Sequence, residues 1–382
     1  MTIRIARLHG RKDLRVETLE DPEAGPGEVV VAIGAGGICG SDIHYYTDGG
    51  IGTIRVREPI IIGHEAAGTV VELGAGVEGL SVGDRVAVNP SHPCGACRFC
   101  REGAHQHCMN MRFKGSAMFL PHDQGFFRDR VAIGAAQCHP IAEGVPMAEA
   151  ALAEPLAVCR RAVTRANEIS GPLEGKRVLV TGAGPIGALC VALAKHFGAA
   201  EIVVTDLQDA TLEVAQAVGA TRTINVARDV AALSEYEIDK GQFDLCFECS
   251  AAEPAIRSAI ACTRPLGTIV QVGVMGDTPV PFNMLVAKEL NLVGTHRFDA
   301  EFGQAVELIN SRALTLAPIV THSLPVDEVQ AAAEALKAAC QRVASIVSPC
   351  KLLRLPEEML LRTLCLLSSR DCWLRWLAPV TR

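Results

Sequence analysis

The 382-residue sequence has no long run of basic residues, and its formal net charge at pH 7 is −7. A protein that binds nucleic acid presents a dense patch of lysine and arginine to the phosphates. The composition therefore argues against nucleic acid as a partner.

Long apolar segments are missing as well. The longest, from Val178 to Ala194, is interrupted by Gly-Ala-Gly-Pro, so a buried strand and helix explain it better than a membrane span. The first ten residues contain no apolar core of the kind that signal peptides have. The 15 cysteines are odd in number, and without a secretory signal we expect reduced thiols in the cytoplasm.

Hydrophobic residues make up 49% of the chain, enough for a sizeable core in roughly two or three domains. Up to about residue 150, short β-branched runs between glycine- and proline-rich turns predict strands, for example Glu28–Ile33 and Arg85–Asn89. From about Glu168, strands such as Arg177–Thr181 alternate with helices such as Pro185–Phe197. This alternation predicts a doubly wound parallel sheet, so the fold class is α/β with a β-rich first part.

Four cysteines lie close together with the spacing C-x2-C-x2-C-x7-C: Cys94, Cys97, Cys100 and Cys108. Four thiolates at such spacing close a tetrahedral shell around zinc and leave no open position, which is typical of a structural site. A disulfide pair or an iron–sulfur cluster would be the alternatives. We call residues of about 90–112 the cysteine lobe and expect it to hold structural zinc.

A second set of metal-type residues is spread over separate loops. Cys39 lies in Gly-Ile-Cys-Gly-Ser-Asp, His64 and Glu65 lie in Gly-His-Glu, and Glu154 lies in Ala-Glu-Pro-Leu. Each residue alone has an ordinary structural explanation. Together they offer sulfur, nitrogen and oxygen ligands with room for water or substrate, which is the composition of a catalytic zinc site.

A glycine-rich loop follows the predicted strand Arg177–Thr181. It reads Gly-Ala-Gly-Pro-Ile-Gly, and a helix follows it, as in dinucleotide-binding proteins. The free N–H groups at the helix start would face a pyrophosphate. The expected contacts come from Gly182, Gly184, Pro185, Ile186 and Gly187. Asp206 ends the next strand, where a carboxylate takes ribose hydroxyls, and no arginine follows directly, so NAD is favoured over NADP.

With these motifs in order, residues 1 to about 338 resemble the zinc-dependent medium-chain alcohol and polyol dehydrogenases. The segment Gly-Ile-Cys-Gly-Ser-Asp-Ile-His-Tyr-Tyr resembles the sorbitol dehydrogenase branch. The segments Asn-Pro-Ser-His-Pro-Cys-Gly and Gly-Thr-His-Arg-Phe-Asp-Ala resemble the L-idonate 5-dehydrogenases within it. The resemblance implies oxidation of a secondary alcohol of a sugar acid, such as L-idonate to 5-keto-D-gluconate, or of a polyol. A catalytically silent nucleotide-binding regulator is a distant alternative.

The resemblance also implies residue roles. Cys39 and His64 would bind catalytic zinc, together with Glu65 or Glu154, since relatives differ in the direct carboxylate ligand. Zinc would lower the pKa of the substrate hydroxyl, and hydride would pass to the nicotinamide. The proton would leave through Ser41 and His44. The polyol pocket would be lined by Tyr45, Phe113 and Arg297, and a sugar acid would need a cation such as Arg297, Arg112 or Lys114.

The domain organisation implied is a split one. A GroES-like catalytic domain would span residues 1–155, a Rossmann domain 156–293, and a return segment 294–338 would rejoin the first domain. The family resemblance also implies a homo-oligomer, either a tetramer or a dimer.

Three features depart from the family pattern. Arg161 stands where relatives usually have histidine, and residues near 125 read Asp-Gln-Gly-Phe-Phe-Arg-Asp-Arg. The tail, 339–382, is rich in leucine, arginine and cysteine and resembles frameshifted translation, although a helical extension is an alternative. A frameshift would remove the return strand that completes the catalytic domain.

Overall fold

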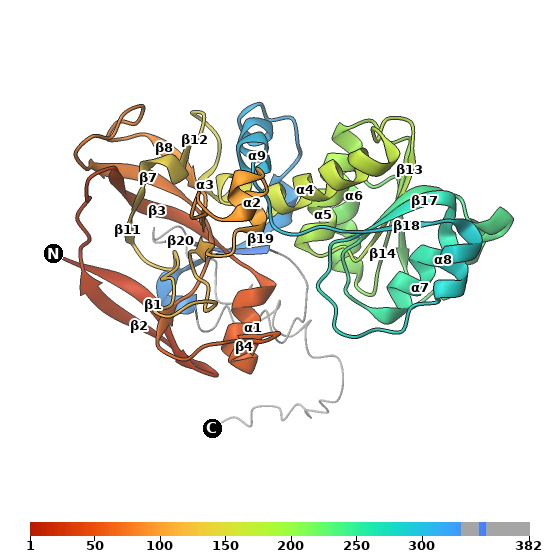
Figure 1. The fold of residues 1–382 in the computed structure, drawn as a ribbon, viewed down its shortest axis with the longest axis horizontal. Coiled ribbons are helices and arrows are strands. Elements are labelled where there is room, and N and C mark those ends of the chain that lie inside the picture. The colour runs from red at the N-terminus through yellow and green to blue at the C-terminus, as the bar shows by residue number, and fades with distance from the viewer. Residues whose placement is uncertain (330–343, 349–382) are drawn as a thin grey trace, which may run out of the picture.

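The computed structural model describes residues 1–329 and 344–348. Figure 1 shows two lobes side by side, a β-rich lobe from the start of the chain and an α/β lobe from its middle. The long helix α4 (Ala153–Ser170) runs between them. Its buried face packs on the parallel sheet and on α9 (Glu301–Asn310), so one hydrophobic core joins the two lobes.

The first lobe consists mainly of short strands. These are β1 (Thr2–Gly10), β2 (Asp13–Glu20), β3 (Glu28–Ile38), β4 (Gly50–Ile51), β5 (Ile54–Arg55), β6 (Ile60–Ile61), β7 (Glu65–Leu73), β8 (Arg85–Val88), β9 (Ser91–His92), β10 (Arg112–Phe113), β11 (Arg130–Gly134) and β12 (Cys138–Pro140). Its short helices are α1 (Gly40–Asp48), α2 (Arg98–Arg101) and α3 (Met147–Ala150). The predicted β-rich character of this part is confirmed.

The main sheet of this lobe has the order β12-β8-β7-β3-β20-β19, with β11 also paired to β3. Strand β3 is apolar along most of its length and is buried on both faces, with Val29, Val31 and Ile33 in the core. Its antiparallel pairing with β7 places Gly37 opposite Glu65. This register brings the end of β3, which Cys39 directly follows, next to the start of β7, which begins at Glu65.

The second lobe alternates strands and helices. These are β13 (Arg177–Thr181), α5 (Pro185–His196), β14 (Glu201–Asp206), α6 (Asp209–Val218), β15 (Arg222–Asn225), β16 (Phe243–Glu248), α7 (Glu253–Cys262), β17 (Thr263–Gln271), α8 (Phe282–Lys288) and β18 (Asn291–Gly294). All five pairings are parallel, and the order is β15-β14-β13-β16-β17-β18. From β13 the chain adds β14 and β15 on one side and then β16, β17 and β18 on the other. Doubly wound sheets bind their ligands at such a switch point, which here lies between β13 and β16. The predicted parallel sheet is confirmed.

After β18 the chain returns to the first lobe through α9, β19 (Val320–Pro325) and β20 (Ala344–Ser348). Strand β20 lies between β19 and β3, with Ile346 opposite Gly37. The expectation that the tail lacks a return strand is therefore wrong, because pairing uses backbone groups and does not require the family sequence. Residues 330–343 and the tail beyond Ser348 lie outside the described residues.

Candidate active site and metal centres

The second metal set comes together where β3, β7 and α1 meet. Cys39 directly precedes α1, His64 precedes β7, and Glu65 begins it. One ligand atom of each of the three lies within 4.8 Å of the others. A Cβ atom at Gly37 would approach Glu65 Oε2 to 1.9 Å, so the carboxylate occupies the space that glycine leaves free. Thiolate, imidazole and carboxylate in one buried corner form a donor set that fits zinc.

Asp42, which the sequence reading left out, holds these loops in place. It is fully buried, accepts hydrogen bonds from the backbone N–H groups of Cys39 (3.0 Å) and Gly63 (2.9 Å), and lies 3.8 Å from His64 Nδ1. One carboxylate thus joins both ligand-bearing loops and sits beside the imidazole, as carboxylates commonly do behind metal-binding histidines. The sequence signal that could have identified Asp42 is the spacing Cys-x-x-Asp, which places the acid in the first turn of a helix.

The electrostatics of this corner favour a bound cation. Burial and the neighbouring Glu154 raise the pKa of Glu65 to about 8. Burial also raises the pKa of Glu154. The pKa of His64 is raised although burial opposes this, because Asp42 and Cys39 lie close to it. The buried carboxyl groups of Glu65, Glu154 and Asp42 repel one another, and a divalent ion beside them would relieve that repulsion.

Glu154 and the predicted pocket residues lie around this group. Glu154 is buried in the first turn of α4, outside the 4.8 Å set, and interacts electrostatically with His64 and Arg297. The Arg297 guanidinium lies 4.5 Å from the ring centroid of Phe113, whose ring is 5.6 Å from that of His64. Tyr45 is buried in α1, and its hydroxyl accepts a hydrogen bond from Ala117 N–H at 3.3 Å.

The predicted relay residues stand at the start of α1. Ser41 is half-buried, whereas His44 is exposed and its Nδ1 lies 2.9 Å from Asp48 Oδ2. The helix therefore runs from the buried metal corner to the surface. This arrangement suits a path along which a proton leaves the site, with His44 at its outer end.

The cysteine lobe has the geometry expected of a closed metal site. The four sulfur atoms lie within 4.8 Å of one another, and Cys97 Sγ and Cys100 Sγ are 3.5 Å apart. Backbone N–H groups donate to sulfur, for example Cys94 to Cys108 Sγ at 3.2 Å. Backbone hydrogen bonds from Ala96 and Cys97 lower the pKa of Cys94 to about 6. A thiolate held by backbone donors is the form that binds zinc, so these residues fit a structural ion.

The nucleotide loop matches the prediction closely. Gly182 has a φ of +87°, which favours glycine, and its Cβ would lie 2.8 Å from Ser250 N. A Cβ at Gly187 would approach Gly182 O to 1.8 Å, so the helix packs on the turn only with glycine there. Helix α5 begins at Pro185, with Gly184 before it. Asp206 accepts a hydrogen bond from Ala183 N–H at 2.7 Å, which places its carboxylate beside the loop.

Glu248 is a second buried acid that the sequence reading missed. It ends β16, next to β13 at the point where strand order reverses. It accepts hydrogen bonds from Ser250 N–H (2.9 Å), Ala251 N–H (3.1 Å) and the Gln271 amide. The loop after β16 and the end of β17 are thus fixed around one carboxylate beside the nucleotide loop. A carboxylate directly after an apolar strand was the signal available in the sequence.

The departure at Arg161 has a local explanation. Its Nη1 lies 3.2 Å from Glu301 Oε1, and Glu301 is buried at the start of α9. The arginine therefore ties α4 to the return segment. Of the other two cations considered for a sugar acid, Arg112 pairs with Asp123 at 3.0 Å, and burial lowers the pKa of Lys114. Arg297 is the cation that lies at the metal corner.

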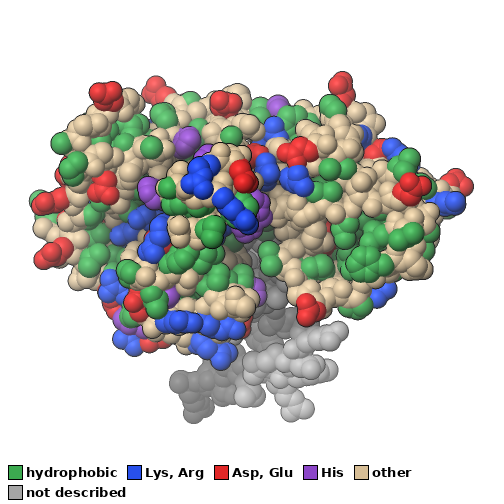
Figure 2. Space-filling view, in the orientation of Figure 1, with side chains coloured by type: hydrophobic (Ala, Val, Ile, Leu, Met, Phe, Trp, Pro, Cys, Tyr) green, Lys and Arg blue, Asp and Glu red, His purple; other side chains and the backbone are tan. Residues whose placement is uncertain are grey.

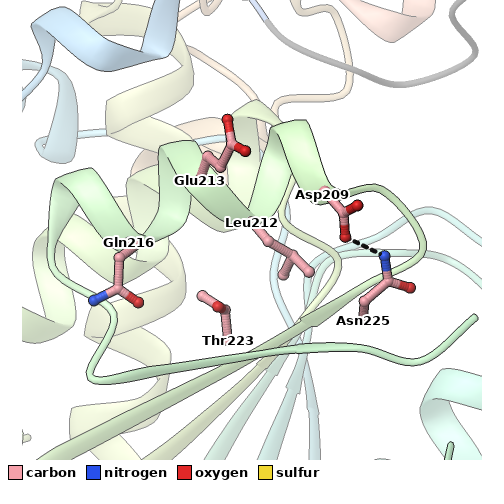
Figure 3. A pocket seen from close by; sticks show the side chains of 6 residues that line it. All are labelled: Asp209, Leu212, Glu213, Gln216, Thr223 and Asn225. Atoms are coloured by element: carbon pink, nitrogen blue, oxygen red, sulfur yellow. Dashed lines mark hydrogen bonds between the residues drawn. The ribbon is translucent and has the colours of Figure 1, made fainter. Parts of the chain in front are cut away.

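A surface hollow on the second lobe is separate from this site. Figure 3 shows it between α6 and the edge strand β15. Its lining residues are Asp209, Leu212, Glu213, Gln216, Thr223 and Asn225. None of these is a predicted metal ligand or loop residue, and the Asn225 amide is engaged by Asp209 at 2.6 Å. We assign no part of the chemistry to it.

Fold and site together define a zinc-type alcohol dehydrogenase. Residues 25–143 match the alcohol dehydrogenase GroES-like domain, and residues 185–311 match the zinc-binding dehydrogenase domain. The chain belongs to this zinc-dependent alcohol dehydrogenase family, whose members use zinc and NAD(P). The predicted family and the predicted GroES-like and Rossmann fold are confirmed.

Individual relatives narrow the class. L-idonate 5-dehydrogenase (NAD(P)(+)) of Escherichia coli (strain K12) is 38% identical over 305 residues, covering 79% of this chain and 86% of that protein. Sorbitol dehydrogenase of Macaca fascicularis is 35% identical over 339 residues, covering 86% and 91%. The crystal structure of L-idonate 5-dehydrogenase from Escherichia coli superposes with a TM-score of 0.83 at 34% identity, covering 91% and 98%. The chain is thus an oxidoreductase of the polyol and sugar-acid dehydrogenase family. No described helix is long and apolar enough to span a membrane.

Proposed function

We propose that this chain oxidises the C5 hydroxyl of a sugar acid, L-idonate, to the ketone 5-keto-D-gluconate, with NAD as the hydride acceptor. The observation that carries the proposal is Arg297, a half-buried cation whose guanidinium lies 4.5 Å from the ring centroid of Phe113, with the Phe113 ring 5.6 Å from that of His64. A guanidinium matches a carboxylate in charge and in shape. The relative named L-idonate 5-dehydrogenase supports the same substrate class.

One group of residues would bind the zinc ion. Cys39 and His64, with Glu65 or Glu154, would hold the zinc, and Asp42 would keep the imidazole oriented. Bound zinc lowers the pKa of an alcohol, and bound NAD accepts the hydride from the carbinol carbon.

Other residues would bind the substrate and cofactor and carry the proton away. Ser41 would take the hydroxyl proton and pass it along α1 to the exposed His44, which Asp48 orients. Gly182, Gly184, Pro185, Ile186 and Gly187 would hold the pyrophosphate, and Tyr45 and Phe113 would line the substrate pocket.

A neutral polyol is the second candidate substrate. The sorbitol dehydrogenase relative favours it, and the metal corner and nucleotide loop would serve either substrate equally. Arg297 would favour the sugar acid of the two, because a neutral polyol gives the guanidinium no carboxylate to bind.

Substrate choice can be tested by measuring initial rates of NADH formation over a panel of sugar acids and polyols. L-idonate and L-iditol are the decisive pair, because L-iditol has a hydroxymethyl group in place of the carboxylate. We expect the higher kcat/KM with L-idonate, and Arg297→Ala to lower that value by roughly ten- to a hundredfold while changing L-iditol little. A wild-type preference for L-iditol that Arg297→Ala does not alter would exclude the sugar-acid function.

Cofactor choice should depend on Asp206. Its carboxylate at the end of β14 would accept the ribose hydroxyls of NAD and repel the 2′-phosphate of NADP. We expect the wild type to have a higher kcat/KM with NAD than with NADP. In Asp206→Ala the difference between the two values should be smaller. The check is kcat/KM for both cofactors, with Asp209→Ala as a control three residues away. A wild type that strongly prefers NADP would refute this role for Asp206.

A further inference from the structure

The segment that carries Arg297 rests on the cysteine lobe. His296, directly before Arg297, stacks on His107 with ring centroids 5.8 Å apart and an interplanar angle of 17°. Asp299, two residues after Arg297, lies 2.8 Å from His105 through Oδ2 and Nδ1. The substrate cation is therefore flanked on both sides by contacts to residues between Cys100 and Cys108.

Arg297 itself contacts the edge of this lobe. Its guanidinium lies over Phe113, and Phe113 packs in one small buried cluster with Cys100, Cys108 and Met111. The same phenylalanine ring is 5.6 Å from the ring of His64. A continuous set of contacts thus joins the sulfur ligands of the lobe, the substrate cation and the catalytic metal corner.

The backbone at Arg297 needs such support. Its φ is +48°, in the left-handed region that side chains with a Cβ rarely adopt. A residue in this region keeps its conformation only when the surroundings fix it. On the far side the segment is anchored by the buried Phe298, which packs against Phe302, and by the bond from Asp299 N–H to Glu301 Oε2 at 3.0 Å. On another side the segment is held by its contacts to the cysteine lobe.

We propose that the cysteine lobe is a specificity element, in which His105 and His107 are positioning residues that orient Arg297 toward the carboxylate of the substrate. This proposal rests on the proposed function, since it assumes that Arg297 binds a sugar acid. The cysteine lobe would then do more than stabilise the fold. Its zinc would fix the positions of His105 and His107, and these two histidines contact residues 296–299. Figure 2 shows histidine and basic side chains gathered where the two lobes of the molecule meet.

The test compares KM for L-idonate and for L-iditol in His105→Ala, Asp299→Asn and His107→Ala. We expect KM for L-idonate to rise roughly three- to tenfold in each variant, with kcat and the KM for L-iditol unchanged, because only the carboxylate contact is lost. His107→Phe keeps a flat ring for the stack with His296 and should restore the wild-type KM. His9→Ala removes a similar histidine–carboxylate contact, to Glu17 at 2.6 Å in the β1–β2 hairpin, and serves as the matched control.

The same substitutions in an Arg297→Ala background decide between positioning and general damage. If His105 and His107 act through Arg297, adding His105→Ala or His107→Ala should not raise KM for L-idonate further. Equal losses for both substrates, or additive losses in the Arg297→Ala background, would overturn the proposal while leaving the proposed function intact. If Arg297→Ala alone lowers kcat/KM for L-idonate no more than it lowers kcat/KM for L-iditol, the proposed function is wrong. The positioning role of His105 and His107 is then wrong as well. Zinc content and Tm of each variant verify that the lobe remains folded.

Discussion

His64→Ala should abolish turnover while leaving a folded protein that still binds NAD. The His64 imidazole supplies one of three ligand atoms that lie within 4.8 Å of one another. Its removal leaves a sulfur and a carboxylate, which bind zinc poorly on their own. We expect kcat to fall roughly a thousandfold or more, since a metal supplies several kcal/mol of transition-state stabilisation. Cys39→Ser should behave in the same way.

The controls separate loss of chemistry from loss of structure. NAD affinity, measured by fluorescence titration, should be unchanged because the nucleotide loop belongs to the other lobe. His9→Ala, remote from the metal corner, should retain activity. A His64→Ala enzyme as active as the wild type would refute the assignment of this corner as the catalytic centre.

Cys97→Ser should instead weaken the fold. Its sulfur is one of four in the cysteine lobe, whose buried cluster otherwise contains only a few side chains. Without the metal the lobe loses its main cross-link. We expect zinc content to fall from two ions per chain to one and Tm to drop by roughly 5–10 °C, as a loss of about 2–3 kcal/mol would give in a domain of this size.

Cys262→Ser is a suitable comparison, because Cys262 lies buried in α7 and belongs to neither metal set. It should keep both zinc ions whatever its effect on Tm. A Cys97→Ser protein that retained two zinc ions and the wild-type Tm would show that the lobe does not bind structural zinc.

Much of the site could be predicted because its parts are short local motifs. The cysteine spacing, Gly-His-Glu and the glycine-rich loop each name their residues within a few positions. The structure groups the four cysteines, places His64 and Glu65 beside Cys39, and leaves no room for a Cβ at Gly187. The parallel sheet was equally readable, since buried strands such as β13 and β16 are continuous apolar runs.

Other features depend on contacts that no local pattern records. Asp42 acts through backbone groups of two separate loops, and Glu248 accepts hydrogen bonds from the loop after β16 and from the end of β17. The pairing of His105 with Asp299 joins residues 194 positions apart. The return strand β20 was misjudged because its sequence differs from the family pattern, although a strand can pair through its backbone alone.

The central claim is that turnover depends on a zinc ion at the corner formed by Cys39, His64 and Glu65. The most direct measurement is the rate of NADH formation from L-idonate as zinc is removed with a chelator and then added back. We predict that activity disappears as the zinc ion at this corner is removed, that NAD binding persists, and that added zinc restores the rate. Full activity in protein that contains no zinc would contradict the account.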